Sequence, residues 1–416
     1  MKTNKKINIL LLVSGSIAAV RIPLLISQLV KENYEVKCVL TKNAEKLIQP
    51  ISISILSRNN CFIDNDQWDH DQSNPLHINL SKWADVIIMA PLTATTLSKW
   101  VYGNAEGLVP SILTASSNKP VIVAPAMNTN MWENKFVRRN YENLKTLDNV
   151  LTLNPSSGLL ACDQFGIGKL PSNDLILLAL KFITSLDGNY KFNDLSNKKF
   201  LITGGATVEE IDPARRVTNK SSGMMSLLLA QVARFRGAQV KYIHGNLEIS
   251  NNLTEGLEKY KIFNGAELRK TLKQEISNYD YLLMNAAVTD ISLTKQTSSK
   301  LSKDKLKNYF ANHMELVPDI LSDINKMKKD NQIFVGFCAY TGNHEDLRLT
   351  IKKKFNIKGC NFIFANPIDI DGQGFGIDAD NGGWLFSESG IEKYIEKTSK
   401  LHLANQLISQ IISFDK

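Results

Sequence analysis

Residues 124–132, Ala-Pro-Ala-Met-Asn-Thr-Asn-Met-Trp, carry side chains that could bind a polar ligand. The apolar run at 121–124 predicts a buried strand, which ends at Pro125. Asn128 is then presented at the carboxyl end of a strand, where open α/β sheets bind their ligands. Its amide can donate and accept hydrogen bonds, and the methionines beside it could form an apolar wall. A turn in which Asn128 only caps a helix explains these residues equally well.

Three other segments could take part in the same chemistry. Residues 13–19, Val-Ser-Gly-Ser-Ile-Ala-Ala, predict a strand-to-helix turn whose amides and hydroxyls could hold a phosphate, although they match neither G-x-G-x-x-G nor a Walker loop. Residues 90–96, Ala-Pro-Leu-Thr-Ala-Thr-Thr, repeat the pattern with three hydroxyls, of which helix capping would explain one. Residues 158–169 form a glycine-rich loop with one cysteine, Cys162. A lone cysteine is more often a small buried apolar residue, but a flexible loop favours a chemical role.

The elements that position these segments alternate between strand and helix. A polar segment at 60–76 reads as a mobile loop or lid that delivers His77 to a short helix at 78–83. This alternation predicts a parallel sheet that is covered on both faces. The strands are expected at 7–13, 35–41, 85–90 and 120–124, and the helices near 17–31, 93–103, 108–117 and 131–145.

A polar, turn-rich segment at 186–198 predicts a domain junction, after which a strand, a glycine turn and a helix begin again. The stretch 208–222 is expected to be a long loop, and its cations and Ser-Ser-Gly before a helix could cradle a phosphate. A solvated charged loop is the alternative. We therefore expect two α/β domains, 1–188 and 189–416. The second should have strands at 199–203, 239–243, 281–285, 333–337 and 361–365, and helices from 224 and near 265–276, 345–356 and 399–413.

The composition is that of an ordinary globular protein of 416 residues, with 22% charged and 43% hydrophobic residues. The net charge of +8 is spread over both halves, so nucleic acid is not an expected partner. Five cysteines without CxxC spacing argue against a disulfide scaffold or structural zinc, and they favour the cytoplasm. The basic, apolar amino terminus imitates a signal peptide, but an amphipathic segment follows it directly, so we interpret it as the first strand. No apolar run approaches the ~18 residues of a membrane span.

Taken in order, the first four motifs resemble those of the flavin-containing cysteine decarboxylases. The match covers about residues 1–185 and rests on GSIAA, APLTATT, PAMNTNMW and GLLACDQFGIG, with His77 ahead of the second motif. The resemblance implies a flavodoxin-like, Rossmann-like domain that forms homo-oligomers, as trimers, and binds FMN. The residues expected to bind FMN are Gly15, Ser16, Thr41, Thr93 and Thr96.

The mechanism that this resemblance implies begins with oxidation of the substrate's cysteine side chain by the flavin. Carbon dioxide then leaves, and the resulting enethiol is reduced while an acid supplies a proton. His77 would act as the base or orienter at the thiol, Asn128 would hold the carboxylate, and Cys162 would donate the proton. Met131 would contribute to substrate binding. An amide suits this task because it holds a departing carboxylate without the charge pairing that would stabilise the ground state.

The second half resembles phosphopantothenate–cysteine ligase over about residues 198–412. The motifs are ITGGAT at 202–207, Asp-Pro-x-Arg at 212–215, Asn-x-Ser-Ser-Gly at 219–223 and MNAAVTD at 284–290, extended by 335–337, 365–366 and 374–376. Behind a decarboxylase domain, this arrangement resembles the bacterial bifunctional proteins of coenzyme A synthesis. It implies activation of 4′-phosphopantothenate by CTP, attack of the L-cysteine amine, Mg²⁺ on the triphosphate, and dimers of the second domain.

The ligase resemblance also implies a set of site residues. Asn219 would hold the acyl intermediate and Lys300 would neutralise nucleotide phosphate, whereas Asp290 and the backbone near 284–286 would read the cytidine. The remaining residues expected to bind substrate or nucleotide are Arg215, Ser221, Ser222, Met284, Asn285, Ala286, Pro318, Asp319, Ile320, Phe337, Lys354 and Lys358. The sequence leaves the residues that would bind a metal ion unknown.

Several positions depart from the family patterns. Asp163 follows the loop cysteine where glycine is usual, and Tyr340 stands where glutamate is expected. Departures near 300–303 and 316–317 leave the preference for CTP or ATP open. One alternative is a decarboxylase of peptide C-terminal cysteines, which would leave the second domain without a role. Another is a catalytically silent regulatory subunit, against which the presence of His77, Asn128 and Cys162 argues.

Overall fold

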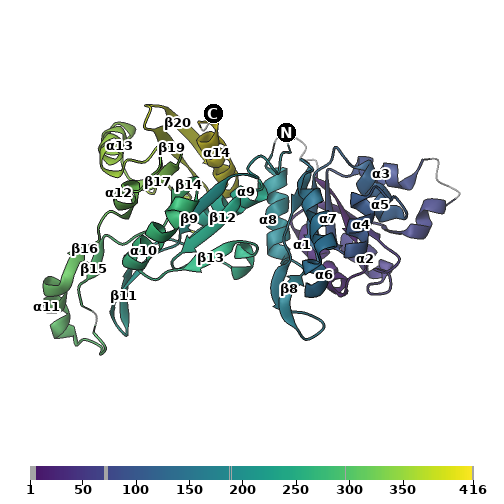
Figure 1. Cartoon of the computed structure of the whole chain (residues 1–416), viewed down its shortest axis with the longest axis horizontal. Helices are drawn as coiled ribbons and strands as arrows, with labels where there is room; N and C mark the ends of the chain where they lie inside the picture. Colours follow the sequence, from purple (N-terminus) through teal and green to yellow (C-terminus); the bar gives the residue numbers. More distant parts are fainter. Residues whose placement is uncertain (1–5, 70–73, 187, 189, 296, 415–416) are drawn as a thin grey trace. The chain divides into compact units, whose positions relative to one another are not determined.

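The computed structural model describes residues 6–69, 74–186, 188, 190–295 and 297–414 (Figure 1). The chain divides into two compact units. The first contains Met1–Asp194 with the short segments Phe235–Gly237 and Asn252–Gly256, and the second contains the rest. The division after Asp194 lies within the polar segment 186–198, where the composition changes.

In the described part of the first unit, six parallel strands form one sheet in the order β3-β2-β1-β4-β5-β6. The order reverses between β1 and β4, which is the arrangement of a doubly wound α/β fold. Every residue of β4 and β5 is buried, as expected for a sheet covered on both faces. The predicted α/β class is confirmed. The strands are β1 (Asn8–Val13), β2 (Glu35–Leu40), β3 (Cys61–Ile63), β4 (Val86–Leu92), β5 (Val121–Pro125) and β6 (Val150–Thr152).

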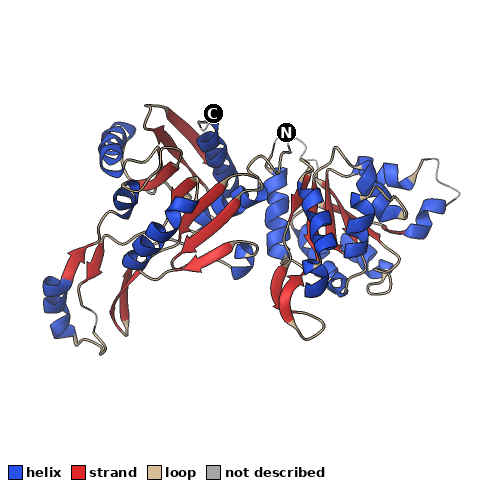
Figure 2. Cartoon of the chain, in the orientation of Figure 1, coloured by secondary structure: helices blue, strands red, loops and turns tan. Residues whose placement is uncertain are grey.

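Helices flank this sheet (Figure 2). Side chains of α3, α4, α5 and α7 share one buried cluster with β1, β4 and β5. The helix predicted at 17–31 consists of two parts, because the 3-10 helix η1 (Ile17–Arg21) precedes α1. The α-helices are α1 (Ile22–Lys31), α2 (Pro50–Ser57), α3 (Leu76–Trp83), α4 (Ala94–Val101), α5 (Leu108–Ala115), α6 (Thr129–Glu133), α7 (Lys135–Lys145) and α8 (Asn173–Thr184).

Two segments that were predicted as loops contain regular structure. The segment 60–76 holds β3 and the 3-10 helix η2 (Asp64–Trp68), while residues 70–73 of the proposed lid lie outside the described residues. The segment 158–169 is largely a hairpin of β7 (Ser156–Leu159) and β8 (Phe165–Lys169), which extends away from the sheet (Figure 1). Only its tip, with Cys162, is a turn.

The backbone of this hairpin lies very close to the backbone of the segment that follows β5. The Gly168 carbonyl accepts a hydrogen bond from the Met127 amide at 2.9 Å, which ties β8 to the segment after β5. A Cβ on Gly168 would lie 2.1 Å from the Met127 oxygen, so only glycine allows this contact. At the tip, Asp163 has a φ of +57°. This left-handed conformation favours glycine, and aspartate is one of the residues that also adopt it.

The second unit repeats the strand order of the first. Its eight-stranded sheet has the order β13-β12-β9-β14-β17-β18-β19-β20, and the order reverses between β9 and β14. Strands β19 and β20 add to its edge in antiparallel orientation and were not predicted. The strands are β9 (Lys199–Gly204), β12 (Gln239–His244), β13 (Glu258–Lys261), β14 (Tyr281–Met284), β17 (Ile333–Tyr340), β18 (Phe362–Pro367), β19 (Asn381–Ser387) and β20 (Glu392–Thr398).

Two parts of the second unit lie outside this sheet. The expected loop 208–222 contains a hairpin of β10 (Val208–Asp212) and β11 (Arg215–Thr218). Strands β15 (Ile291–Leu293) and β16 (Met314–Leu316) pair and carry α11 (Lys303–His313) in an extension in which no described side chain of α11 is buried (Figure 1). The other helices are α9 (Met224–Phe235), α10 (Gly265–Glu275), α12 (Ile320–Asn325), α13 (His344–Lys358) and α14 (Lys400–Ser413).

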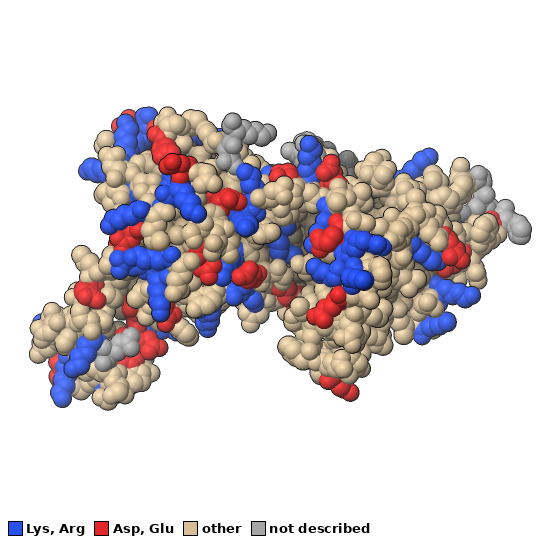
Figure 3. Space-filling view, in the orientation of Figure 1, with Lys and Arg blue, Asp and Glu red and all other residues tan. Residues whose placement is uncertain are grey.

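The surface carries both signs of charge. Figure 3 shows Lys and Arg side chains interspersed with Asp and Glu over the drawn face. Among the residues described, no helix is both long and apolar enough to cross a membrane.

Candidate active sites

A cavity of about 400 Å³ lies in the first unit, where the strand order reverses between β1 and β4. Doubly wound sheets bind nucleotides and flavins at this point. Most of the residues that line it come from the turns after β1, β2 and β4 and from the segment after β5, and the others are Asp64, Lys99, Glu106, Gly107 and Pro110. The structure brings together in this cavity all the residues predicted to bind the cofactor, namely Gly15, Ser16, Thr41, Thr93 and Thr96.

Short hydrogen bonds hold these turns together. The Ser14 hydroxyl donates to the Pro91 carbonyl at 2.6 Å and accepts from the Thr93 amide at 3.0 Å. A Cβ on Gly15 would lie 2.4 Å from Cβ of Asn43, so glycine allows the turns after β1 and β2 to approach. The cavity is therefore preorganised by the strand ends.

The lining residues fit a flavin nucleotide. Hydroxyls and backbone amides at a helix start, together with the Lys42 and Lys99 ammonium groups, suit a phosphate, while Met127 and Met131 provide apolar surface. Sequence reasoning missed both lysines, because neither belongs to a motif. Lys99 also pairs with Glu106 at 2.8 Å, and this hydrogen bond and charge lower the pKa of the Glu106 carboxyl.

Asn128 combines the two roles that the sequence left open. Its Oδ1 accepts a hydrogen bond from the Asn130 amide at 2.9 Å and caps α6. Its Nδ2 donates to the Cys162 sulfur at 3.2 Å. Asn128 lines both the 400 Å³ cavity and a second cavity of about 360 Å³, which Cys162 also lines. The amide thus lies where the two cavities meet.

His77 is the predicted decarboxylase residue that the structure does not bring to this place. It is the second residue of α3, is half-buried, and lines neither cavity. Within one chain, the structure therefore joins Asn128 and Cys162 but not His77.

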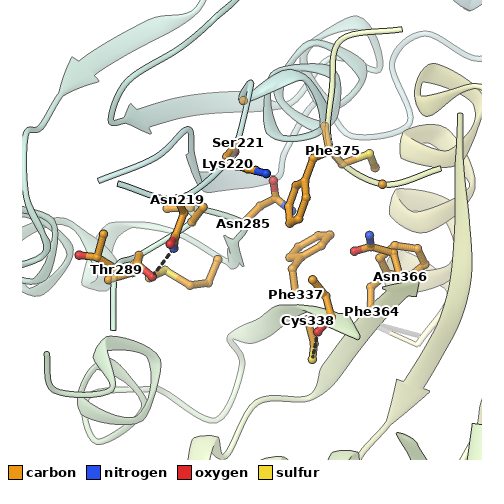
Figure 4. Close-up of a pocket in the computed structure, with 18 of the residues that line it drawn as sticks. Asn219, Lys220, Ser221, Asn285, Thr289, Phe337, Cys338, Phe364, Asn366 and Phe375 are labelled. Atoms are coloured by element: carbon orange, nitrogen blue, oxygen red, sulfur yellow. Dashed lines mark hydrogen bonds between the residues drawn. The ribbon is translucent and has the colours of Figure 1, made fainter. Parts of the chain in front are cut away.

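A larger cavity of about 610 Å³ lies in the second unit, where the start of α9, the segment after β14 and residues of β17, β18 and α13 line it (Figure 4). The rings of Phe337 and Phe375 point into it, with Asn219 on one side and Asn366 on the other. The predicted residues that line it are Asn219, Ser221, Ser222, Met284, Asn285, Ala286, Asp290, Pro318, Asp319, Ile320, Phe337, Lys354 and Lys358.

Defined contacts orient several of these side chains. The Asn219 Nδ2 donates to the Val288 carbonyl at 2.8 Å (Figure 4). Asp319 caps α12 and pairs with the Lys358 ammonium at 3.1 Å. The Lys354 Nζ lies 2.7 Å from the Cys338 sulfur. The cavity is therefore lined by amides and by four lysines, Lys220, Lys354, Lys358 and Lys400, a donor set that suits a carboxylate or phosphate ligand.

Arg215 and Lys300 do not line this cavity. The Arg215 guanidinium pairs with Asp212 at 3.4 Å, and the amide of Leu301 donates to the same carboxylate at 3.2 Å. Asp212 thus anchors the backbone of Leu301, and with it the segment that carries Lys300, to the β10–β11 hairpin.

Sequence reasoning also missed lining residues from the carboxyl-terminal part of the chain, notably Asn366 and Lys400. Asn366 was quoted only as part of a motif. Lys400 is buried, donates to the Gly376 carbonyl, and has a pKa lowered by burial. No group of three or more His, Cys, Asp or Glu side chains in the described residues is arranged to hold a metal ion.

Two α/β units, each with a cavity beside the carboxyl ends of its central strands, are typical of an enzyme that binds flavins or nucleotides. Residues 1–184 match the family model "Flavoprotein", and residues 195–414 match "DNA/pantothenate metabolism flavoprotein C-terminal domain". The chain is 35% identical over 374 residues to the coenzyme A biosynthesis bifunctional protein CoaBC of Borreliella burgdorferi, with 89% of this chain and 91% of the relative covered. For the Bacillus subtilis protein, identity is 32% over 412 residues, with 98% and 97% covered.

The chain therefore belongs to the family of coenzyme A biosynthesis bifunctional proteins, and it is an enzyme that combines a decarboxylase with a ligase. Among solved structures, the C-terminal domain of a CoaBC bifunctional protein is 27% identical, with 53% of this chain and 97% of that chain covered and a TM-score of 0.43. A PPC decarboxylase mutant complexed with pantothenoylaminoethenethiol is 32% identical, with 44% and 100% covered and a TM-score of 0.40.

Proposed function

We propose that this chain converts 4′-phosphopantothenate and L-cysteine into 4′-phosphopantetheine in two steps. The second unit, in the domain 189–416, ligates the two substrates with CTP. The first unit, in the domain 1–188, decarboxylates the resulting 4′-phosphopantothenoylcysteine with FMN. The observation that carries the proposal is the contact between Asn128 and Cys162 at the meeting of two cavities, one of which fits a flavin nucleotide.

In the decarboxylase step, the protein binds the substrate's cysteine end and supplies a proton. Gly15, Ser16 and the threonine hydroxyls would hold FMN, which when bound supplies the two-electron oxidation of the cysteine side chain and its later reduction. The Asn128 amide would hold the carboxylate until carbon dioxide leaves. The Cys162 thiol, which lies 3.2 Å from that amide, would protonate the carbon from which the carboxylate has departed.

In the ligase step, the cavity of the second unit would hold the nucleotide and the acyl group. Asn219 is fixed by the Val288 carbonyl and would position the acyl intermediate, while Lys354 and Lys358 would neutralise phosphate. Mg²⁺ would enter bound to the triphosphate, which is usual for nucleotide-dependent chemistry. Lys300 and Arg215 would act only after the segments that carry them approach the cavity.

The assembly and location of the enzyme are part of the same proposal. A homo-oligomer, with trimers of the first domain and dimers of the second, would let His77 of a neighbouring copy complete the decarboxylase site. The proposed setting is the cytoplasm. All the proposed substrates are small molecules.

The first test is an absorbance spectrum of the purified protein between about 350 and 500 nm. We expect this spectrum to show flavin bands, and we expect heat to release a flavin that is identified as FMN. In a separate ligase assay, we expect the formation of 4′-phosphopantothenoylcysteine to depend on CTP. A colourless protein that does not take up added FMN would contradict the decarboxylase assignment.

A further inference from the structure

A cysteine and a lysine that line the cavity of the second unit are in direct contact, and the proposed ligation does not use the cysteine. The Lys354 Nζ donates a hydrogen bond to the Cys338 sulfur across 2.7 Å. The Cys338 thiol in turn donates to the Ala339 carbonyl at 3.4 Å. In Figure 4, Cys338 lies next to Phe337, whose ring points into the cavity. The contact places a nucleophilic nitrogen beside an oxidisable sulfur.

The packing of a helix on the sheet fixes this contact. Cys338 belongs to β17, and Lys354 belongs to α13. Leu347 and Ile351 of α13 share a buried cluster with Cys338. Lys354 follows Ile351 by three residues, so it lies on the same face of the helix, and it is half-buried there. The two side chains are therefore held together by two packed elements of secondary structure.

Lys354 differs from the other lysine that α13 contributes to the cavity. Lys358 pairs with the Asp319 carboxylate at 3.1 Å. Over the described ranges of the chain, no carboxylate forms an ion pair with Lys354. A cation beside the sulfur is typical of cysteines that react with oxidants. Cys338 is only 8% exposed, but the cavity of about 610 Å³ that it lines gives a small oxidant access to it.

We propose that Cys338 and Lys354 form an oxidative cross-link site, at which hydrogen peroxide converts their contact into a sulfur–nitrogen bond. Peroxide first transfers one oxygen to the Cys338 thiol, which gives a sulfenic acid and one water. The Lys354 amine then attacks the sulfur, the S–O bond breaks, and a second water leaves. The sulfur loses the two electrons that reduce the peroxide. The thiol loses one hydrogen and the ammonium loses two, so one proton is released with the two waters.

The cross-link removes a positive charge from the cavity, because a sulfenamide nitrogen is neutral. This consequence rests on the proposed function, in which Lys354 neutralises nucleotide phosphate. Thiols reverse the link, because one thiol attacks the sulfur and releases the amine, and a second forms a disulfide with the first and restores the Cys338 thiol. L-cysteine, the proposed amino-acid substrate, is such a thiol. The second unit therefore binds nucleotide fully only while reduced cysteine is available.

The chemical test is peptide mass spectrometry of the full-length protein after treatment with hydrogen peroxide. A protease that cleaves after Asp and Glu separates Cys338 from Lys354 at Glu345 and Asp346. We expect the fragments 331–345 and 347–369 to be joined, with a mass two hydrogens below their sum. Treatment with L-cysteine should release the two fragments.

Three variants identify the joined atoms. A disulfide between Cys338 and Cys360 would join the same fragments with the same change of mass, so the link must persist in Cys360→Ala. Lys354→Arg should abolish the link, because a guanidinium stays protonated and cannot attack the sulfur. Lys358→Arg is the matched control in the same helix and cavity, and it should retain the link. Circular dichroism checks that each variant is folded.

A second test measures CTP binding by titration calorimetry, in the presence of Mg²⁺ and after the peroxide has been removed. We expect the oxidised wild-type protein to bind CTP at least about tenfold more weakly, because one charged hydrogen bond to phosphate is lost. L-cysteine should restore the affinity. In Cys338→Ala, the affinity for CTP should not differ between treated and untreated protein.

Two results would overturn the inference. Fragments that stay unlinked, whether Cys338 is unchanged or carries a sulfinic acid, would show that the amine does not capture the oxidised sulfur. Loss of the link in Cys360→Ala would assign it to a disulfide. A reduced wild-type protein that does not bind CTP would instead contradict the proposed function, and mass spectrometry would still decide whether the cross-link forms.

Discussion

The side-chain nitrogen of Asn128 lies 3.2 Å from the sulfur of Cys162, although the two residues belong to different elements, the start of α6 and the tip of the β7–β8 hairpin. The contact depends on the base of the hairpin, where the Met127 amide donates to the Gly168 carbonyl. Sheet and hairpin therefore each supply one half of the proposed decarboxylase site.

Replacement of Cys162 by serine should separate the two halves of the decarboxylation. A serine hydroxyl is a far weaker acid than a thiol, so oxidation and loss of carbon dioxide should proceed while the final reduction fails. Mass spectrometry should detect a product two hydrogens lighter than the aminothiol. Cys61→Ser, which changes a cysteine that lines neither cavity, should give the normal product. Normal aminothiol from Cys162→Ser would remove Cys162 from the acid role.

The hairpin geometry offers a matched pair of glycine substitutions. Gly158 and Gly168 have φ angles of +159° and +157°, so alanine meets similar backbone strain at both. At Gly168 the new Cβ would lie 2.1 Å from the Met127 carbonyl oxygen, whereas at Gly158 it would meet only the flexible Lys169 side chain at 3.4 Å. Displacing the hairpin should cost about 1–3 kcal/mol. We expect Gly168→Ala to slow decarboxylation at least about tenfold and Gly158→Ala to change it much less. Similar rates for both variants would show that the Met127 contact does not position Cys162.

Asn219→Asp should impair ligation selectively. The change replaces the Nδ2 donor to the Val288 carbonyl with an oxygen that repels it, at a cost of about 1–3 kcal/mol. Formation of 4′-phosphopantothenoylcysteine should fall at least about tenfold, while decarboxylation of added 4′-phosphopantothenoylcysteine should not change. A parallel loss of both activities would contradict the assignment of separate sites to the two units.

Burial predicts an order of cysteine reactivity. Desolvation raises the pKa of the Cys61 thiol to about 12 and that of Cys360 to about 11. At pH 8, these pKa values leave only about one in ten thousand Cys61 thiols and about one in a thousand Cys360 thiols ionised. The thiolate is the reactive form, so both cysteines should react slowly. Peptide mass spectrometry after iodoacetamide treatment should therefore show labelling of the exposed Cys162 first, with Cys61 and Cys360 gaining label as the pH rises. Early labelling of Cys61 would show that its environment is open.

The central strands of both sheets were predictable because their sequences are nearly continuous apolar runs, as in β4 and β5. The β7–β8 hairpin was not, because glycine and polar residues hide the alternation that indicates a strand. The edge strand β20 has exposed residues at most positions and gives an equally weak pattern.

The predictability of the site residues follows a similar division. Predicted residues at the ends of central strands, such as Thr93 and Met284, line a cavity, because the fold class determines where strand ends meet. The positions of His77 and Lys300 relative to the cavities could not be predicted. A motif shows which residues are adjacent in the sequence, but not which residues are close in the folded structure. Single cations such as Arg21 and Lys400 carry no pattern at all, and only the tertiary structure brings them to a cavity.

The presence of both units in one continuous chain links the capacity to form 4′-phosphopantothenoylcysteine to the capacity to consume it. Translation produces the two catalytic cavities in a fixed one-to-one ratio, so no change in gene expression can raise one capacity without the other. The balance between making and consuming 4′-phosphopantothenoylcysteine then depends only on the turnover of each site. A variant that slows only the first unit should therefore accumulate that compound in the cell.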